Sequence, residues 1–184
     1  TIPSVRDDLK YAVRQELFQD TQTETVTLRH SPSETALPIR RLGSFLPGTG
    51  VGGAGAHWNG LTWRLMESDH LLRSHLENRY GKNAVPAEMT IADFPVTYAE
   101  LEPYYDHFEK LCGISGKAGN LRGTKVEGGN VFEGPRQNEY PNKPLAMTIR
   151  GELMQKASKE LGYHPFQAPA ANMSEAYTNT EGLT

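Results

Sequence analysis

The segment from Leu46 to Arg64, LPGTGVGGAGAHWNGLTWR, holds the residues with the most chemical potential. Six glycines and two alanines surround His57 in it, and two tryptophans follow the histidine. Glycine relaxes the steric limits on φ and lets main-chain N–H groups approach a bound molecule closely. The imidazole and the tryptophan rings add a polar contact and an aromatic surface. The segment therefore predicts a loop against which a flat or phosphorylated cofactor lies.

The same segment contains the spacing GxGxxG twice, beginning at Gly48 and at Gly50. A dinucleotide-binding turn also needs a buried strand before its first glycine and a helix after its third. The residues before Gly48 are too polar and broken for such a strand, and Asn59-Gly60 follows where the helix is needed. We therefore reject a Rossmann interpretation of this loop.

Other side chains capable of chemistry lack partners at the spacing that a site requires. His70 and His75 are five residues apart, not the four that place two imidazoles on one helical face. We expect surface or capping roles for the histidines other than His57, and solvent-facing positions for most carboxylates near the 97–112 segment. We predict no metal site and assign no catalytic residue in the chain. The histidines are His30, His70, His75, His107 and His164, and the carboxylates are Asp93, Glu100, Glu102, Asp106 and Glu109.

The composition is that of a loop-rich chain without the charge of a nucleic-acid binder. Its 184 residues include 18 glycines and 12 prolines, and hydrophobic residues make up 37%. A net charge of -3 supplies no basic surface for nucleic acid or an anionic membrane. No apolar run reaches the about 18 residues that a transmembrane segment needs, and the single Cys112 excludes an internal disulfide.

Local patterns predict four helices. Apolar residues at helical spacing favour helices over 5–20, 69–80 and 151–161, and glycines end the second and third of these. The clearest signal is the capping box of Thr97 and Glu100, in which each side chain satisfies a backbone N–H of the other residue. It predicts a helix from 97 to 112. The expected apolar side of this helix is Tyr104, Tyr105, Phe108 and Leu111.

Two features reduce the regularity of the chain. Pro103 removes a backbone donor, so we expect a kink there or a second helix that starts at this residue. From 113 to 144 the sequence shows no periodicity, which predicts a segment that is either disordered or laid over a larger body and held by Val131-Phe132, Tyr140 and partner surfaces. A short strand is predicted over 24–29 by alternation. The fold class is therefore α+β, with three to four helices, few short strands and long irregular segments.

The run Gly52-Gly53-Ala54-Gly55-Ala56-His57-Trp58 resembles the flavin attachment loop of the glucose-methanol-choline (GMC) oxidoreductases. Further blocks in the same order are similar to the gluconate 2-dehydrogenase flavoprotein branch of that family, and together they cover most of the chain. These blocks are 6–19, 36–64, 93–120, 130–140 and 161–166. The Rossmann motif that opens the family and the catalytic histidine near its C-terminus are both missing here. The resemblance therefore implies an internal segment of a longer enzyme, inactive by itself.

The resemblance implies an FAD-dependent enzyme that oxidises CH–OH groups of sugars, sugar acids or alcohols by hydride transfer and passes electrons to a haem or quinone. It implies that residues 1–66 belong to the FAD-binding domain and that 67–184 form a substrate-side segment that covers it. His57 is the implied covalent anchor of the flavin, or a polarising neighbour of it. The implied cofactor-binding residues are Gly52, Gly53, Gly55, Ala56, His57, Trp58 and Asn59.

The same resemblance implies a sugar or polyol-type substrate and a periplasmic, membrane-associated complex with a small subunit and a cytochrome c subunit. A hypothesis from another class remains open beside it. In that hypothesis the chain is a non-catalytic binding or scaffold module whose glycine- and proline-rich middle wraps a partner protein. It predicts that the isolated chain folds cooperatively without flavin, whereas an enzyme segment exposes apolar surface when separated from its parent.

Overall fold

The computed structural model describes residues 26–29, 31–35, 37–39, 51–53, 55 and 58–184, and every structural statement below concerns these residues. The chain divides into two compact units, and each is described by itself. The first comprises 1–59 with 86–90, and the second comprises 60–85 with 91–184. The helix predicted over 5–20 lies outside the described residues.

The first unit contains a short antiparallel pair of strands. Strand β1, Val26–Leu28, pairs with β2, Leu37–Ile39, so that Val26 lies opposite Ile39 and Leu28 opposite Leu37. The strand predicted over 24–29 is confirmed. Strand β2 was not predicted, because its central Pro38 argues against a strand unless the strand lies at an edge. Among the residues that the structure describes, β2 pairs with β1 alone.

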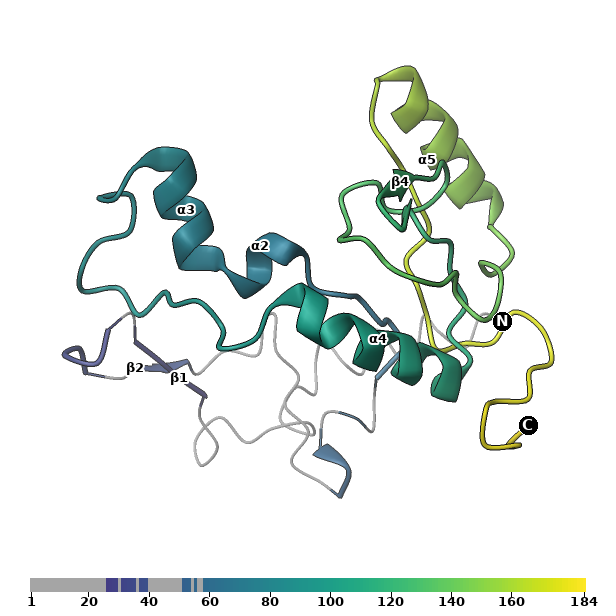
Figure 1. Ribbon diagram of the computed structural model, residues 1–184, viewed down its shortest axis with the longest axis horizontal. Coiled ribbons are helices and arrows are strands. Elements are labelled where there is room, and N and C mark those ends of the chain that lie inside the picture. Colours follow the sequence, from purple (N-terminus) through teal and green to yellow (C-terminus); the bar gives the residue numbers. More distant parts are fainter. Residues whose placement is uncertain (1–25, 30, 36, 40–50, 54, 56–57) are drawn as a thin grey trace, which may run out of the picture. The chain divides into compact units, whose positions relative to one another are not determined.

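The predicted helix over 69–80 is present but interrupted. Helix α2, Glu67–His70, stops at Leu71, and α3, Leu72–Tyr80, continues to Gly81, whose N–H donates to the Glu77 carbonyl. Figure 1 shows the two as separate helical segments joined by a bend. No residue of α3 is buried, so its leucines do not form the core face that their spacing favoured.

Helix α4, Tyr98–Cys112, begins at the predicted capping box. The Thr97 hydroxyl accepts from the Glu100 N–H, and the Glu100 carboxylate accepts from the Thr97 N–H at 2.7 Å. The helix ends at Gly113, which adopts a left-handed conformation with φ of 62°. The expected restart at Pro103 is wrong, because one helix continues through it (Figure 1). Buried side chains before and after Pro103 are bonded to other segments and hold both halves of α4 in place.

The expected apolar side of α4 is wrong at two of its four residues, while Tyr105 and Leu111 are half-buried. Tyr104 and Phe108 are exposed, whereas the buried residues of the helix are Tyr98, Glu102 and Glu109. These three lie four and seven residues apart and so share one face of the helix. The buried face is therefore polar, and two of the five carboxylates, most of which were expected in solvent, lie inside the second unit.

The irregular segment from 113 to 144 is ordered against its own chain. Two-residue strands β3, Asn120–Leu121, and β4, Thr124–Lys125, form a hairpin that the sequence did not predict. Arg122 and Gly123 connect them with positive φ values of 51° and 86°, as a tight hairpin turn requires. Of the two predicted anchors, Tyr140 is buried but Phe132 is exposed.

Backbone packing within this segment is so close that two glycines are required. A Cβ atom on Gly119 would lie 2.2 Å from the carbonyl carbon of Asn130, and one on Gly129 would lie 2.2 Å from that of Ala118. Real Cβ contacts are much longer, so both positions exclude every other residue without a backbone shift. The two stretches pass each other in direct main-chain contact.

The last helix, α5, Ile149–Glu160, confirms the prediction over 151–161 with a slightly earlier start. The Thr148 hydroxyl caps it by accepting from the Gly151 N–H at 3.2 Å. The mixture of helices, short strands and long irregular segments confirms the α+β fold class. Among the helices that the structure describes, none has the length and apolarity that a membrane crossing requires.

Candidate functional site

The glycine-rich loop adopts the backbone conformation that its composition favours. Gly52 and Gly53 have φ values of 94° and 56°, which side-chain-bearing residues rarely adopt. A Cβ atom on Gly55 would meet no heavy atom within 4 Å. The loop is therefore open at Gly55, and nothing in the described residues fills the space that the missing side chain leaves.

The residues after Gly55 complete the described part of the loop. The Trp58 N–H donates to the Gly55 carbonyl at 3.2 Å, which closes a tight turn. Trp58 is 52% exposed, so it is not a core residue, and Asn59 is also exposed. Ala56 and His57 lie outside the described residues. The predicted binding roles of all seven loop residues stay predictions.

Arg64, five residues after Asn59, is the centre of a buried polar cluster. Its guanidinium donates from Nε and Nη2 to the two carboxylate oxygens of Glu109, at 2.7 and 2.8 Å. Its Nη1 donates to Glu102 at 3.1 Å and to the Tyr98 hydroxyl at 3.2 Å. The Arg64 side chain is 2% exposed. Its charge is therefore compensated by the polar face of α4.

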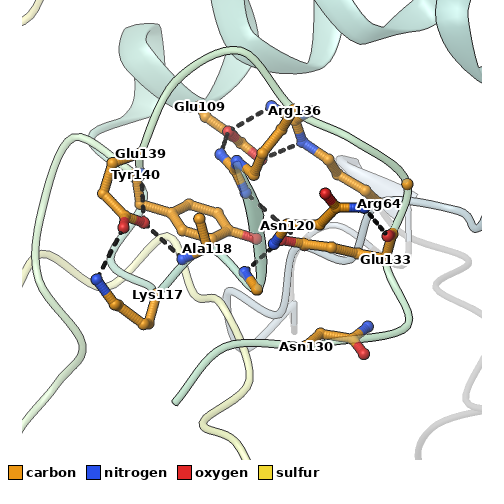
Figure 2. Close-up of polar contacts among 12 residues, drawn as sticks. Arg64, Glu109, Lys117, Ala118, Asn120, Asn130, Glu133, Arg136, Glu139 and Tyr140 are labelled. Atoms are coloured by element: carbon orange, nitrogen blue, oxygen red, sulfur yellow. Dashed lines mark hydrogen bonds and ion pairs between the residues drawn. The ribbon is translucent and has the colours of Figure 1, made fainter. Parts of the chain in front are cut away.

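A second guanidinium shares the same carboxylate. Arg136 Nη2 also donates to Glu109, and Figure 2 shows both arginines beside this residue. Arg136 Nε donates to the Asn138 carbonyl at 2.7 Å, and its guanidinium lies 3.7 Å from the centre of the Tyr140 ring. The irregular segment is thus attached to α4 through Glu109.

Along the irregular segment, side-chain carboxylates accept hydrogen bonds from backbone N–H groups, as a neighbouring strand would in a sheet. Glu133 accepts from the N–H groups of Gly119 and Asn120 at 2.6 and 3.2 Å. Glu139 accepts from the N–H groups of Ala118 and Tyr140, and its other oxygen accepts from Lys117 at 3.0 Å (Figure 2). These bonds satisfy backbone donors that would otherwise be buried without partners.

Burial and the neighbouring charges act in opposite directions on the pKa values of the cluster. Burial opposes the charge of Arg64, but the hydrogen bonds and negative charge of Glu109 raise its pKa above the ordinary value. Burial raises the pKa of Glu133, although the Gly119 N–H and the charge of Arg136 oppose the shift. Three carboxylates face two guanidiniums, so a proton on Glu133 would neutralise the cluster. The three carboxylates are Glu102, Glu109 and Glu133.

The cluster has a structural role, because it leaves no room for a substrate. The cavity beside it, lined by Trp63, Arg64, Asn130, Glu133 and Tyr140 among others, has a volume of about 10 Å³. That volume holds about one water molecule. Both carboxylate oxygens of Glu109 and Oε1 of Glu102 already accept hydrogen bonds within the chain. The described residues also contain no group of three side chains that could hold a metal ion.

Sequence reasoning missed this cluster because its members are far apart in the chain. Glu102 and Glu109 look like ordinary helix-surface charges until Arg64 and Arg136 are placed beside them. The expectation for His70 is also wrong, because it is 1% exposed with Nδ1 3.2 Å from the Val96 carbonyl oxygen. The other described histidines are half-buried or exposed.

The sequence of the chain is similar to those of known proteins over most of its length. No protein-family model matches the chain. The chain is 47% identical over 183 residues, 98% of its length, to the gluconate 2-dehydrogenase flavoprotein of Pantoea cypripedii. It is 28% identical over 128 residues, 70% of its length, to the fructose dehydrogenase large subunit of Gluconobacter japonicus.

The chain spans 30% of the length of the first relative and 20% of the second. The alignment with the first relative covers 98% of this chain. It therefore covers most of the blocks on which the resemblance was based. This match confirms that the chain is related in sequence to the gluconate 2-dehydrogenase flavoproteins.

Proposed function

We propose that the chain supplies the flavin-facing loop of an FAD-dependent dehydrogenase of the GMC type. The enzyme oxidises CH–OH groups of sugars, sugar acids or alcohols and passes the electrons to a haem or quinone acceptor. The observation that carries this proposal is the 47% identity, over 98% of the chain, to a protein named as a dehydrogenase flavoprotein. The weaker similarity to a fructose dehydrogenase subunit supports the same substrate class.

The geometry of the described loop fits a flavin. A flat ring needs a backbone that approaches it without side chains in between, and Gly52 and Gly53 carry no side chain and turn the backbone with positive φ values. The open space at Gly55 gives further room. The ring of Trp58, which is 52% exposed, would form an aromatic wall.

Each loop residue has a role in this proposal. Gly52, Gly53, Gly55 and Ala56 leave room for the ring, while Trp58 and Asn59 wall it or hydrogen-bond to it. His57 is bonded to the flavin or lies against it as a polarising neighbour. The bound FAD would supply the redox chemistry by accepting a hydride from the substrate carbon. The base that deprotonates the substrate hydroxyl is expected elsewhere in the complete protein.

The proposal extends to the partner subunits and the cellular location of the enzyme. From the family resemblance of the sequence, we assign it a small subunit, a cytochrome c subunit and a periplasmic, membrane-associated location. The alternative scaffold hypothesis has less support, because the irregular middle segment is bonded to its own chain through Glu102, Glu109 and Arg136. That segment does not require a partner protein to define its path.

The test uses the complete protein with its cofactor. The purified wild-type protein should show visible flavin absorbance, and acid precipitation followed by washing should leave the colour on the polypeptide if His57 is the covalent anchor. His57→Ala should then release the colour into the supernatant. Gly55→Val should lower the flavin content, because its side chain enters the open space, whereas an exposed change such as Glu127→Gln should not. A colourless wild-type protein would refute the proposal.

A further inference from the structure

We propose that one side of helix α5, with the groove beside it, is an interface with the part of the complete polypeptide that lies outside residues 1–184. The interface rests on the proposed function only in so far as this chain is part of a longer flavoprotein, and it involves no flavin contact. All of its residues belong to the second unit.

Helix α5 exposes an apolar side. Ile149 and Leu153 are 77% and 63% exposed, and the exposed Ala157 continues the same line at the next interval of four residues. Leu161, directly after the helix, extends this line and is also exposed. No residue of α5 is buried. The half-buried residues, which face the rest of the unit, are Gly151, Gln155 and Ser158.

The exposed apolar side deprives α5 of the usual source of helix stability. An isolated helix of about 12 residues is marginal in water, and most helices in proteins are stabilised by the packing of an apolar side. The Thr148 cap is local, and the ion pair between Lys159 and Glu127 is largely exposed and therefore weak. Further packing against Ile149 and Leu153 is what the helix needs.

A groove next to this apolar side can receive side chains of the covering segment. It has a volume of about 510 Å³ and is lined by α5 and by the extended stretches before and after it. The exposed Met154 lines the groove and lies next to Leu153, so the groove continues the apolar surface of the helix. The other apolar residues that line it are Leu145, Ala146, Met147, Pro165 and Phe166.

The covering segment belongs to the same polypeptide, because apolar exposure is spread over the whole second unit. Interfaces with a partner subunit or a second copy usually cover one patch of about 800 Å² on each partner. Removing part of a fold instead uncovers several elements, since each helix must bury one side against a neighbour. Large exposed side chains on α3, α4 and the irregular segment are Leu72, Tyr80, Tyr104, Phe108 and Phe132.

The buried apolar residues show the same deficit. Of those that the structure describes, Tyr98 alone lies in a helix. The chain spans 30% of the length of the gluconate 2-dehydrogenase flavoprotein that it matches, so most of that relative lies outside the matched part. A corresponding part of the complete protein is long enough to cover α5. The buried apolar residues are Val85, Tyr98, Ile114, Ala118, Tyr140 and Ala170.

The first experiment measures thiol labelling of two variants of the complete polypeptide by a maleimide. Leu153→Cys places a thiol on the apolar side of α5, and Glu152→Cys places one on the charged side of the same helix. Both positions are exposed in the structure, and mass spectrometry distinguishes their labelling from that of Cys112. We expect labelling at least about tenfold slower at 153 than at 152, because a covered thiol reacts only when the interface opens. Equal rates at the two positions in folded protein would overturn the interface.

The second experiment identifies the covering segment without a substitution that could prevent folding. The complete protein is produced with a diazirine analogue of leucine and irradiated, and cross-links from residue 153 are identified by mass spectrometry. We expect them to join 153 to peptides of the same polypeptide outside 1–184. Cross-links to another subunit, or between labelled and unlabelled copies in an isotope mixture, would overturn the assignment.

The outcomes also separate the interface from the proposed function. Slow labelling at 153 in a colourless protein would refute the flavin proposal and support the interface. Equal labelling at 152 and 153 in a protein that holds flavin would do the reverse.

Discussion

Arg64 and Glu109 lie 45 residues apart in the sequence, yet two parallel hydrogen bonds of 2.7 and 2.8 Å join the guanidinium to the carboxylate. Arg136, near the C-terminal end of the irregular segment 113–144, donates to the same carboxylate. Three stretches of chain thus meet at one buried side chain. The stability of the second unit should depend on this residue more than on any exposed ion pair that the structure describes.

Glu109→Ala should therefore destabilise the protein strongly. It leaves two buried guanidiniums without their shared acceptor, and loss of one partner of a buried pair costs about 3 to 5 kcal/mol. Urea unfolding followed by circular dichroism measures the change. The matched control is Glu127→Ala, which removes a pair with Lys159 at 3.2 Å in which the glutamate is 88% exposed. The control should change stability by about 0.5 kcal/mol or less, and equal effects of the two changes would contradict the structural role of Glu109.

Gly119→Ala should be poorly tolerated, although it adds only one methyl group. The new Cβ would lie 2.2 Å from the backbone of Asn130, and main-chain atoms cannot rotate away as a side chain does. We expect a loss of about 3 kcal/mol, at the upper end of the range for overpacking. Gly55→Ala serves as the control, because its Cβ would meet nothing within 4 Å. The midpoint temperatures of thermal unfolding of the two variants should differ by many degrees. Near-identical melting curves would contradict the close main-chain contact between Gly119 and Asn130.

Asp93 should contribute to stability in a pH-dependent way. Its carboxylate accepts from the Ser74 hydroxyl and from the Ser74 N–H, in the first turn of α3, and these bonds lower its pKa below the ordinary 3.8. A folded-state pKa below the unfolded one gives stability that is fully present above the unfolded value. That contribution is lost as the pH falls through the folded value.

Asp93→Asn should therefore be less stable than the wild type near neutral pH, and the difference should shrink below about pH 3.8. Urea unfolding at several pH values measures the difference. Glu88→Gln provides a control, because Glu88 is an exposed carboxylate elsewhere in the chain. A difference between wild type and Asp93→Asn that stays constant across the pH range would show that the carboxylate charge is not responsible.

Thr97→Ala should weaken the start of α4. The hydroxyl that accepts from the Glu100 N–H is lost, and N-cap replacements of this kind cost about 1 kcal/mol. Thr124→Ala, at an exposed position of β4, is the control and should have a smaller effect. Equilibrium unfolding in urea compares the two. Equal stability of the variants would mean that the tertiary bonds of α4 make its cap dispensable.

The sequence predicted the helix ends well because their signals are local. The capping box at Thr97 and the glycine at Gly113 act within one turn of the helix, so neither depends on the rest of the fold. The hairpin around Arg122-Gly123 was missed for the opposite reason. Its turn lacks the Asn-Gly or Asp-Gly pair that marks such turns, and its strands are two residues long.

The buried face of α4 was beyond the reach of pattern analysis. Hydrophobic periodicity assigns the core to aromatic residues, and by that rule Tyr104 and Phe108 face inward. The rule failed because the partners of this helix are arginines from distant segments, which favour carboxylates over apolar side chains. The backbone at Gly52-Gly53 could be predicted because glycine adopts positive φ values more readily than other residues do.

The irregular segment takes its path from a few acidic side chains that accept backbone N–H groups: Glu102, Glu133 and Glu139. A strand in a sheet spreads the same task over many main-chain partners, so no single side chain is decisive there. Here the reverse holds, so substitutions at exposed positions between these acids should be tolerated. Insertions that lengthen the gaps between the acids should be more harmful than substitutions within them.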